Sequence, residues 1–540
     1  MNEMSQTIVK GSTAIHIPYR QTGFFSKIVI DYLNGDEKLK PFYNYAPDVA
    51  GIKQAVKDRK DFNYDRKLLV EELKNQYQGL NVSAKLAHHL ELLLLPNTFT
   101  ITTAHQPNIF TGPLYFVYKI LHAIKLAESL QQELSDYNFV PVFYMGSEDA
   151  DLEELGSVTI NGRKYQWQTK QTGAVGRMKV DKAFIQLMNE LHGQLAVQPH
   201  GEEILTLFRI CYKEGKTIQQ ATLELVNALF GEYGLVVLIP DNANLKRPFI
   251  PVVERELKEQ FSHNIVERTL SDLSKYYKEQ AGGRDINLFY LLDDKRERIE
   301  LRNSKFEVQS LGLQFDEADI LNELKQHPER FSANVILRGI FQEMILPNVA
   351  FIGGGAEIAY WLELKNVFEV AKVPYPVLVI RNSFLILTRE QQELFQSLGF
   401  LIEDIFKSER ELINQYTLRE SHHQLSLSEE KGELNSFYQK LHDTLLSLDP
   451  TLSEHVNALQ AKSLKKVDAL EKKMLRSAKR KFEAEQRKIH KIKTLLFPND
   501  GLQERVENIA GFYAKEGAGV INKMYEDSLA LEQAFTIVTY

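Results

Sequence analysis

The chain contains very little cysteine, with only Cys211 among its 540 residues. A single thiol cannot form an internal disulfide framework, and it cannot build a cysteine-based zinc site. No apolar run approaches the eighteen or so residues that a membrane-spanning helix needs. The N-terminus also lacks the basic, apolar and small-residue order of a secretory signal. These absences predict a cytoplasmic protein that does not associate with membranes.

Standard nucleotide-binding motifs are absent as well. No G-x-x-x-x-G-K-[ST] loop is present, and Gly353-Gly354-Gly355 does not have the G-x-G-x-x-G spacing of a dinucleotide site. The net charge of −7 gives no general case for nucleic-acid binding. Cations outnumber carboxylates 13 to 4 between Lys462 and Lys493, but Phe482 is the only aromatic residue among them. This run favours the solvated face of a long helix, so no nucleic-acid partner is expected.

Strand-like and helix-like segments alternate through most of the chain. Short apolar, β-branched stretches end in turns of polar residues or glycine, at 99–101, 139–145, 234–239, 349–352 and 375–380. Strands that alternate with helices predict an α/β fold with a mostly parallel, helix-covered sheet. We assign residues 1–389 to this core, including an N-terminal helical region and insertions at about 152–230 and 243–330.

The pattern beyond residue 390 is helical. The span from Ser453 to Leu496 contains no proline or glycine, so it is predicted to run as one helix of about 60 Å. A helix of that length must pair with another helix, from residues 390–447 or from a partner chain. We expect an antiparallel coiled-coil domain over 390–515, with 516–540 packing back on the core.

The most informative segment runs from Thr102 to Tyr115. It reads as the end of a strand, a polar turn and the start of a helix at Leu114, where free N–H groups could bind an anion. Asn108 or Thr111 could cap that helix, with Pro113 in its first turn. The alternative is a tight turn without a ligand, in which the histidine is an ordinary hydrogen-bonding residue. The candidates for catalysis and substrate binding are His105, Gln106, Asn108, Thr111, Gly112 and Tyr115.

Carboxylates crowd the end of the strand at 139–145. Such groups can hold Mg²⁺ through water, bind an amine or act as a general base, and their mutual repulsion raises some of their pKa values. The alternative is an acidic first helical turn that complements the helix dipole. This explains Glu153 and Glu154 better than it explains Glu148 and Asp149. We therefore predict catalytic roles for Glu148 and Asp149, and substrate binding by Asp151.

Two later turns offer further ligand groups. Glycines before a helix let the backbone approach a ligand, which suggests substrate binding by Gly353, Gly354, Glu357 and Tyr360. A guanidinium, an amide and a hydroxyl follow the strand at 375–380, a set suited to phosphate or ribose. The turn after Leu496 is the second nucleotide candidate, although a plain helix–turn–helix corner is an equal alternative. The nucleotide-binding candidates are Arg381, Asn382, Ser383, Asn499, Gly501, Gln503 and Arg505.

Taken in order along the chain, these motifs resemble the bacillithiol-biosynthesis family BshC. The resemblance rests on Thr103-Ala104-His105-Gln106-Pro107, Val140–Phe143 before Glu148-Asp149, Phe331–Val335, Ile352-Gly353-Gly354, Glu357–Trp361, Arg381-Asn382-Ser383 and Leu502–Arg505. Two positions depart from the expected pattern. Asn108 stands where the family often has a glycine after the Gln-Pro pair. Ala150 stands where the family often has a histidine after Glu-Asp. The absence of a histidine at position 150 makes His105 the favoured catalytic histidine.

The resemblance implies a Rossmann-like core with two connecting insertions, and a coiled coil that forms a homodimer and lies near a nucleotide pocket. It also implies a ligase that joins cysteine to the amine of glucosaminyl-malate, using ATP with Mg²⁺ and releasing ADP or AMP, with no structural metal. In that reaction His105 would stabilise developing charge, Glu148 or Asp149 would accept a proton, and Arg381 and Arg505 would hold phosphates. The alternative is a nucleotide-binding scaffold without turnover.

Overall fold

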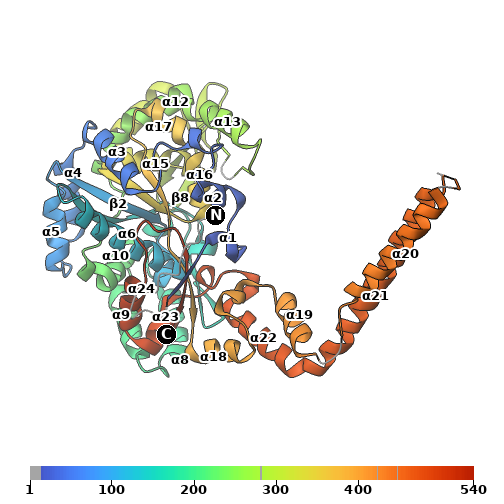
Figure 1. Ribbon diagram of the computed structural model, residues 1–540. Coiled ribbons are helices and arrows are strands. Elements are labelled where there is room, and N and C mark those ends of the chain that lie inside the picture. The colour runs from blue at the N-terminus through green and yellow to red at the C-terminus, as the bar shows by residue number, and fades with distance from the viewer. Residues whose placement is uncertain (1–13, 280–281, 422–423, 447, 450) are drawn as a thin grey trace. The chain divides into compact units, whose positions relative to one another are not determined.

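The computed structural model describes residues 14–279, 282–421, 424–446, 448–449 and 451–540 (Figure 1). The first thirteen residues of the predicted core therefore lie outside the described part. The chain forms two compact units. The first contains the residues up to Leu385 together with Gly501–Val538, and the second contains Ile386–Asp500 with the last two residues.

A five-stranded parallel sheet lies at the centre of the first unit. Its order is β14-β13-β2-β3-β6. The strands are β2 (Thr98–His105), β3 (Asn138–Met145), β6 (Val236–Leu238), β13 (Asn348–Gly353) and β14 (Val377–Ile380). They are almost entirely buried, as expected for a parallel sheet covered on both faces. The predicted α/β class with a mostly parallel sheet is confirmed.

Helices enclose this sheet (Figure 1). Helices α3 (Val49–Lys60) and α6 (Leu114–Glu133) share one apolar core with the sheet, in which Ile52, Ile101 and Leu130 are fully buried. The other helices of this layer are α2 (Lys27–Leu33), α4 (Arg66–Gln76), α5 (Ala84–Leu92), α15 (Val335–Ile345), α16 (Gly355–Leu362) and α17 (Lys365–Ala371). The sheet register places the carboxyl ends of β2, β3 and β13 side by side, because His105 pairs with Met145 and Thr103 with Ile352.

The start of α6 differs from the prediction. Pro113 is the N-cap, without a side-chain cap, and the predicted caps Asn108 and Thr111 are buried in the preceding turn. The Leu114 N–H donates to the Glu507 carbonyl at 2.8 Å. Because a segment distant in sequence supplies this partner, the first N–H of α6 is not free to bind an anion. The predicted capping by Asn108 or Thr111 is wrong.

The first insertion contains a hairpin followed by helices. Strands β4 (Ser157–Ile160) and β5 (Arg163–Gln166) pair antiparallel, as the sequence predicts. The turn residues Asn161 and Gly162 have φ of 49° and 77°, the left-handed backbone that a two-residue hairpin turn requires. The helices that follow are α8 (Lys182–Leu195), α9 (Gly201–Cys211) and α10 (Ile218–Phe230).

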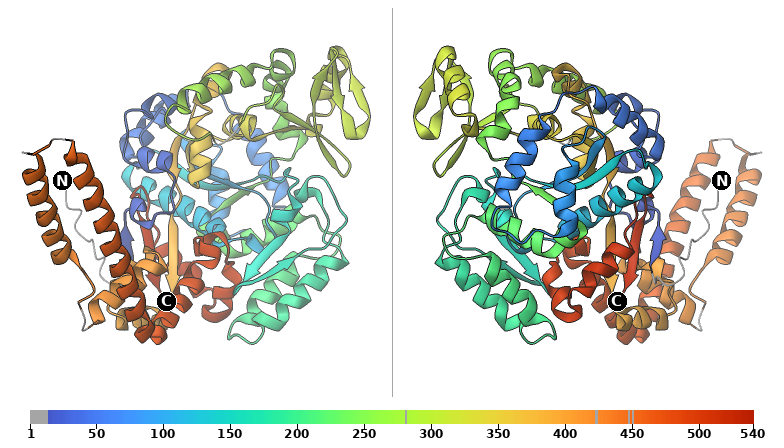
Figure 2. Two further views of the ribbon diagram at one scale, coloured as in Figure 1. Left: turned by 90° about the vertical axis from the view of Figure 1, so that its right-hand side faces the viewer. Right: turned by 90° about the vertical axis from the view of Figure 1, so that its left-hand side faces the viewer.

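The second insertion combines helices with two small sheets. Helices α11 (Ala243–Lys246), α12 (Ile250–Glu259) and α13 (Phe261–Leu273) precede the sheets β12-β7-β8 and β11-β10-β9. The strands are β7 (Leu288–Leu292), β8 (Lys295–Arg298), β9 (Glu300–Arg302), β10 (Lys305–Val308), β11 (Leu313–Phe315) and β12 (Phe331–Ala333), with α14 (Glu317–Gln326) before β12. Figure 2 shows the strands of 288–315 and the helices α8 and α9 at opposite ends of the unit.

The second unit is helical. Helices α18 (Arg389–Ser397) and α19 (Glu409–Glu420) precede α20 (Ser428–Leu446) and α21 (Leu452–Lys479). Lys431 pairs with Glu471, and Tyr438 hydrogen-bonds Ser463, both at 2.7 Å. The later residue of α20, Tyr438, contacts the earlier residue of α21, Ser463. The two helices therefore run antiparallel and form a hairpin.

The predicted continuous helix from Ser453 to Leu496 is wrong. The chain breaks at Arg480–Phe482, between α21 and α22 (Glu483–Leu496), where Phe482 has φ −117° and ψ 33°. The Phe482 ring packs on Tyr416 with centroids 5.5 Å apart. The Gln486 amide donates to the Lys479 carbonyl at 2.6 Å, which satisfies a group that the break leaves free. Tertiary contacts therefore override a local sequence without helix breakers.

The chain returns to the first unit earlier than expected. From Gly501 onward it belongs with the sheet unit, because α23 (Ile509–Glu516) packs on α9. The helical unit ends at Asp500, whereas the coiled-coil domain expected from the sequence extends to residue 515. Helix α24 (Gly519–Glu526) follows, and strand β16 (Phe535–Thr539) pairs antiparallel with β1 (Ile15–Ile17). Within the described residues, no helix combines the length and apolarity needed to cross a membrane.

Candidate functional site

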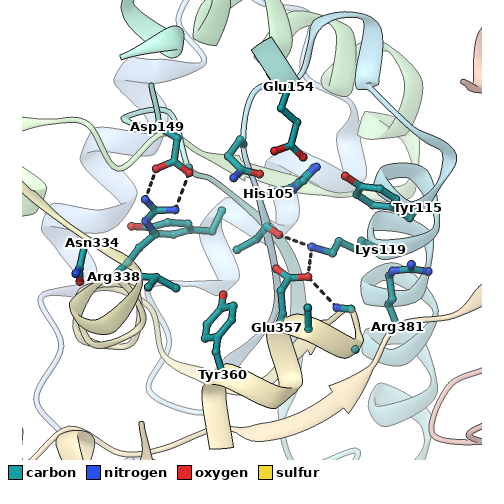
Figure 3. Close-up of a pocket in the computed structure, with 18 of the residues that line it drawn as sticks. His105, Tyr115, Lys119, Asp149, Glu154, Asn334, Arg338, Glu357, Tyr360 and Arg381 are labelled. Atoms are coloured by element: carbon teal, nitrogen blue, oxygen red, sulfur yellow. Dashed lines mark hydrogen bonds and ion pairs between the residues drawn. The ribbon is translucent and has the colours of Figure 1, made fainter. Parts of the chain in front are cut away.

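A cavity of about 640 Å³ lies at the carboxyl ends of β2, β3 and β13. This is the position at which parallel α/β sheets bind ligands. Figure 3 shows side chains from β2, α6, α15 and α16 directed into it. Its ionisable lining consists of His105, Lys119, Asp149, Glu154, Arg284, Arg296, Arg298, Arg338, Glu357, Arg381 and Arg505, with the phenols Tyr115, Tyr144 and Tyr360.

His105 stands at the end of β2 with an unused hydrogen-bonding atom. Its Nε2 is buried and has no hydrogen-bond partner among the described residues. The ring packs edge-on against Tyr115, with centroids 5.2 Å apart. Burial, reinforced by the charges of Lys119 and Arg381, holds the pKa of His105 well below its usual value. The imidazole is therefore neutral at pH 7, and a buried ring nitrogen without a partner is typical of a site that a ligand completes.

Lys119 and Glu357 form an ion pair at the base of this cavity. The Lys119 Nζ lies 2.5 Å from a Glu357 carboxylate oxygen and also donates to the Ala104 carbonyl at 2.9 Å. The same Glu357 oxygen accepts the Gly354 N–H at 2.8 Å, which caps α16. Burial lowers the pKa of Lys119, against the opposing effect of Glu357. The glycine turn that we expected to receive a ligand thus already holds a carboxylate of the chain.

Asp149 is held by two arginines. Arg338 binds it in a two-point contact, with one N–O distance of 2.9 Å, and Arg296 lies 3.7 Å away. Although burial opposes the shift, Arg338 holds the pKa of Asp149 below its usual value. The Arg296 guanidinium stacks over Phe289 at 3.8 Å, and burial lowers its pKa to about 10. Asp149 therefore orients arginines and is a weak base.

Of the three consecutive residues predicted to bind phosphate, Arg381, Asn382 and Ser383, only the first lines the cavity. Arg381 lines the cavity, where its guanidinium pairs with Glu504 at 2.6 Å and donates to Ser383 at 2.9 Å. Asn382 is buried, and its N–H donates to His122 Nδ1 at 3.0 Å. Asn382 is consequently committed to another part of the protein, and Ser383 is bonded to Arg381 and Glu504.

The structure brings about half of the predicted residues together. His105, Gln106, Tyr115, Asp149, Gly354, Glu357, Tyr360, Arg381 and Arg505 line the cavity. The others lie outside its lining: Glu148, Asn108, Thr111, Gly112, Asp151, Gly353, Asn382, Ser383, Gly501 and Gln503, while Asn499 belongs to the second unit.

Glu148 is the most consequential of these differences. Its carboxylate is buried, pairs closely with Lys246 and accepts a hydrogen bond from Ser332 at 3.2 Å. The structure thus places Glu148, predicted as a catalytic residue, outside the cavity lining and pairs its charge inside the fold. Asp151 instead caps the four-residue helix α7 (Leu152–Leu155), accepting the Glu154 N–H at 3.2 Å.

Sequence reasoning missed most of the arginines and one lysine. Lys119 could have been found, because it follows Tyr115 by one helical turn and so shares its face. Arg296 and Arg298 also share a face, since they alternate along β8. Nothing local indicated that this face would reach the sheet edge. The residues missed are Lys119, Glu154, Arg284, Arg296, Arg298, Asn334 and Arg338.

The features above define a Rossmann-like α/β protein with a charged pocket at the strand ends and a helical C-terminal unit. Residues 13–382 match the family model for the BshC N-terminal Rossmann-like domain of bacillithiol biosynthesis, and residues 384–540 match its C-terminal coiled-coil domain. The chain belongs to the bacillithiol biosynthesis BshC family. This confirms the resemblance drawn from the sequence motifs.

Relatives extend over nearly the whole chain. The protein named "Putative cysteine ligase BshC" from Flavobacterium johnsoniae is 38% identical over 525 residues, which is 97% of this chain and 99% of the relative. Its namesake from Flavobacterium psychrophilum is 39% identical, with the same coverage of both chains. A more distant namesake from Bacillus cytotoxicus is 26% identical and covers 93% of this chain and 96% of its own length.

Proposed function

We propose that this protein joins L-cysteine to the amino group of glucosaminyl-malate, in the last step of bacillithiol synthesis, with nucleotide-dependent activation of the cysteine carboxylate. The observation that carries the proposal is the cavity at the strand ends, where cationic side chains outnumber carboxylates and His105 has a free nitrogen. The names of the relatives support a cysteine ligase.

The cationic side of the cavity suits a substrate with two carboxylates. Arg284 and Arg298 are exposed and make no side-chain ion pair with a described residue. Arg296 lies beside them, ordered by its contacts with Phe289 and Asp149. Guanidinium groups bind carboxylates through paired hydrogen bonds. We assign the malate part of the substrate to these three arginines.

Activation is required because a free carboxylate does not acylate an amine at neutral pH. ATP would supply it by forming a mixed anhydride of cysteine, as an acyl phosphate or an acyl adenylate. Arg505 lines the same cavity and can neutralise nucleotide phosphates, next to Arg381, whose guanidinium is already paired with Glu504. Mg²⁺ would enter bound to those phosphates.

His105 is assigned to the reacting centre. As a neutral ring with an unpaired Nε2, it can hydrogen-bond an oxygen of the transferring acyl or phosphoryl group. Lys119 and Arg381 lie close enough to lower its pKa, so their positive charges also act on that oxygen. The N-terminus of α6 is not part of this assignment, because its first N–H is occupied by Glu507.

The test is reconstitution with purified components. The protein is incubated with glucosaminyl-malate, cysteine, ATP and Mg²⁺, the conjugate is sought by mass spectrometry, and the nucleotide is analysed by chromatography. We expect one conjugate per nucleotide cleaved, and the release of ADP or AMP identifies the anhydride. Intact ATP and no conjugate, from protein that restores synthesis to an extract lacking it, would indicate the scaffold function instead.

We also propose that the helical hairpin forms a homodimer. It exposes large apolar side chains, with Phe437 56%, Leu459 42% and Leu470 52% accessible. Exposed apolar surface of this kind favours association with a second helix pair. Sedimentation analysis should give twice the chain mass, and replacing Phe437 and Leu470 by Lys should give a monomer.

A further inference from the structure

Three carboxylates line the cavity, and two of them are already occupied. Asp149 is bound by Arg338 and approached by Arg296. Glu357 is bound by Lys119 and by the Gly354 N–H. Arg338 holds the pKa of Asp149 below its usual value, although burial opposes that shift, and the Glu357 carboxylate already accepts two donors of the chain.

Glu154 is different. It lies on α7, immediately beyond the acidic turn that follows β3, and its carboxylate makes no hydrogen bond or ion pair with a described residue. Figure 3 shows this carboxylate pointing toward the His105 ring. Partial burial, followed by the charges of Asp151 and Asp149, raises the pKa of Glu154. Glu154 is thus a lining carboxylate without a partner among the described residues, and it is available to accept a proton from a ligand.

The unpaired His105 nitrogen is an independent sign of what belongs between these two residues. The buried Nε2 can hydrogen-bond the acyl or phosphoryl oxygen assigned to it above, and the facing Glu154 carboxylate can accept a hydrogen bond from an amine N–H. An amine that attacks beside that oxygen would therefore lie between the two side chains.

We propose that Glu154 binds the attacking amine of the substrate and accepts its proton. This proposal rests on the ligase function proposed above. The amine enters as an ammonium group and gives one proton to the Glu154 carboxylate, which passes that proton to water. The neutral amine nitrogen then attacks the carbonyl carbon of the cysteine mixed anhydride and forms the C–N bond. The bond from that carbon to the bridging oxygen of the anhydride breaks, and phosphate or AMP leaves with the electron pair. The second nitrogen proton passes to the regenerated Glu154 carboxylate and from there to water.

The test compares E154Q with E153Q. Glu153 is the matched control, because it is exposed on the same short helix and does not line the cavity. Loss of a general base typically costs 10²–10⁴ in rate, so kcat of E154Q should fall about 10²-fold or more. The acidic limb of the wild-type kcat/KM profile should be lost, E154D should restore part of the rate, and E153Q should behave as wild type. An E154Q enzyme within about threefold of wild type, with its acidic limb intact, would overturn the proposal.

A binding measurement separates this proposal from the ligase assignment itself. Calorimetry of glucosaminyl-malate binding, in buffers of different ionisation enthalpy, counts the protons exchanged on binding. Replacing the carboxylate by an amide should weaken binding about tenfold and increase proton release, because the bound amine loses the anion opposite its charge. If E154Q binds glucosaminyl-malate with the affinity and proton release of the wild type, Glu154 does not contact the substrate amine, whether or not turnover is found. Altered binding without turnover in the wild type would leave the contact standing and remove the ligase function.

Discussion

Two charged clusters lie at the same end of the sheet, and they differ in how completely their groups are paired. The first, here called the anchoring cluster, consists of Glu148, Lys246, Asp241 and Arg177. Lys246 binds Glu148, and Arg177 makes a two-point contact with Asp241 at 2.6 Å. The second is the cavity next to it, where His105 and Glu154 have no such partners.

The adjacent residues Glu148 and Asp149 show the difference over a single step of the chain. Glu148 points into the anchoring cluster and links β3 to α11 and β12. Asp149 points into the cavity and holds its arginines. A buried charge with complete partners makes the fold depend on those partners, because removing one of them leaves the other uncompensated, whereas incompletely paired groups in a cavity are available to a ligand.

The largest effect is expected from breaking the anchoring cluster. Lys246→Met leaves the buried Glu148 carboxylate without its cation, which should lower the free energy of unfolding by about 3–5 kcal/mol. Chemical denaturation measures this. The double variant Lys246→Met/Glu148→Leu removes both charges and should recover much of the loss. A loss below about 1 kcal/mol in the single variant would show that the cluster is not structural.

Replacement of His105 and replacement of His122 should have opposite effects on turnover and stability. His105→Ala should lower turnover at least ~10²-fold, with little change in stability, because no hydrogen bond of the fold is lost. His122 bonds the Asn382 N–H and the Ala530 carbonyl, so His122→Ala should mainly destabilise the fold. Turnover assays and thermal unfolding of both variants check this. Wild-type turnover in folded His105→Ala would remove His105 from the reaction.

Acid should weaken the fold through His122. Burial lowers the pKa of His122 from 6.5 to about 4, so the unfolded chain binds more protons than the folded protein between these values. The contribution of His122 to the free energy of unfolding is therefore complete above about pH 6.5. As the pH falls toward 4, the free energy of unfolding decreases by about 2–3 kcal/mol. His105 acts in the same direction. Denaturation across pH 4–7 should show this slope, and His122→Gln should make it shallower; an identical slope would assign it to other groups.

The smallest effect concerns the exposed arginines. Arg298→Ala removes one carboxylate contact, so KM for glucosaminyl-malate should rise about tenfold, while KM for cysteine stays unchanged. Arg302→Ala is the matched control, because Arg302 is exposed on the following strand and does not line the cavity. Equal effects of the two substitutions would mean that Arg298 contributes only general positive charge.

Local sequence patterns predicted much of the fold. The β-branched runs at 99–101, 139–145 and 349–352 indicated buried strands, and the helices between them required parallel connections. Parallel strands place their carboxyl ends together, so the ends of β2 and β3 predict the position of the cavity from the sequence. The ordered motifs in these turns also identified the family.

By itself, the sequence determined the fold class, the family, the edge of the sheet that holds the cavity, and His105 as a lining residue. Only the tertiary structure decided that Glu148 is sealed by Lys246, that Asn508 and Glu507 close the turn before α6, and that the long helix breaks at Arg480–Phe482. The reason is physical: strand and helix patterns arise from neighbours within a few residues. The partner of a charge or an N–H can come from anywhere in the chain, and that partner decides whether the group stabilises the fold or remains free for a ligand.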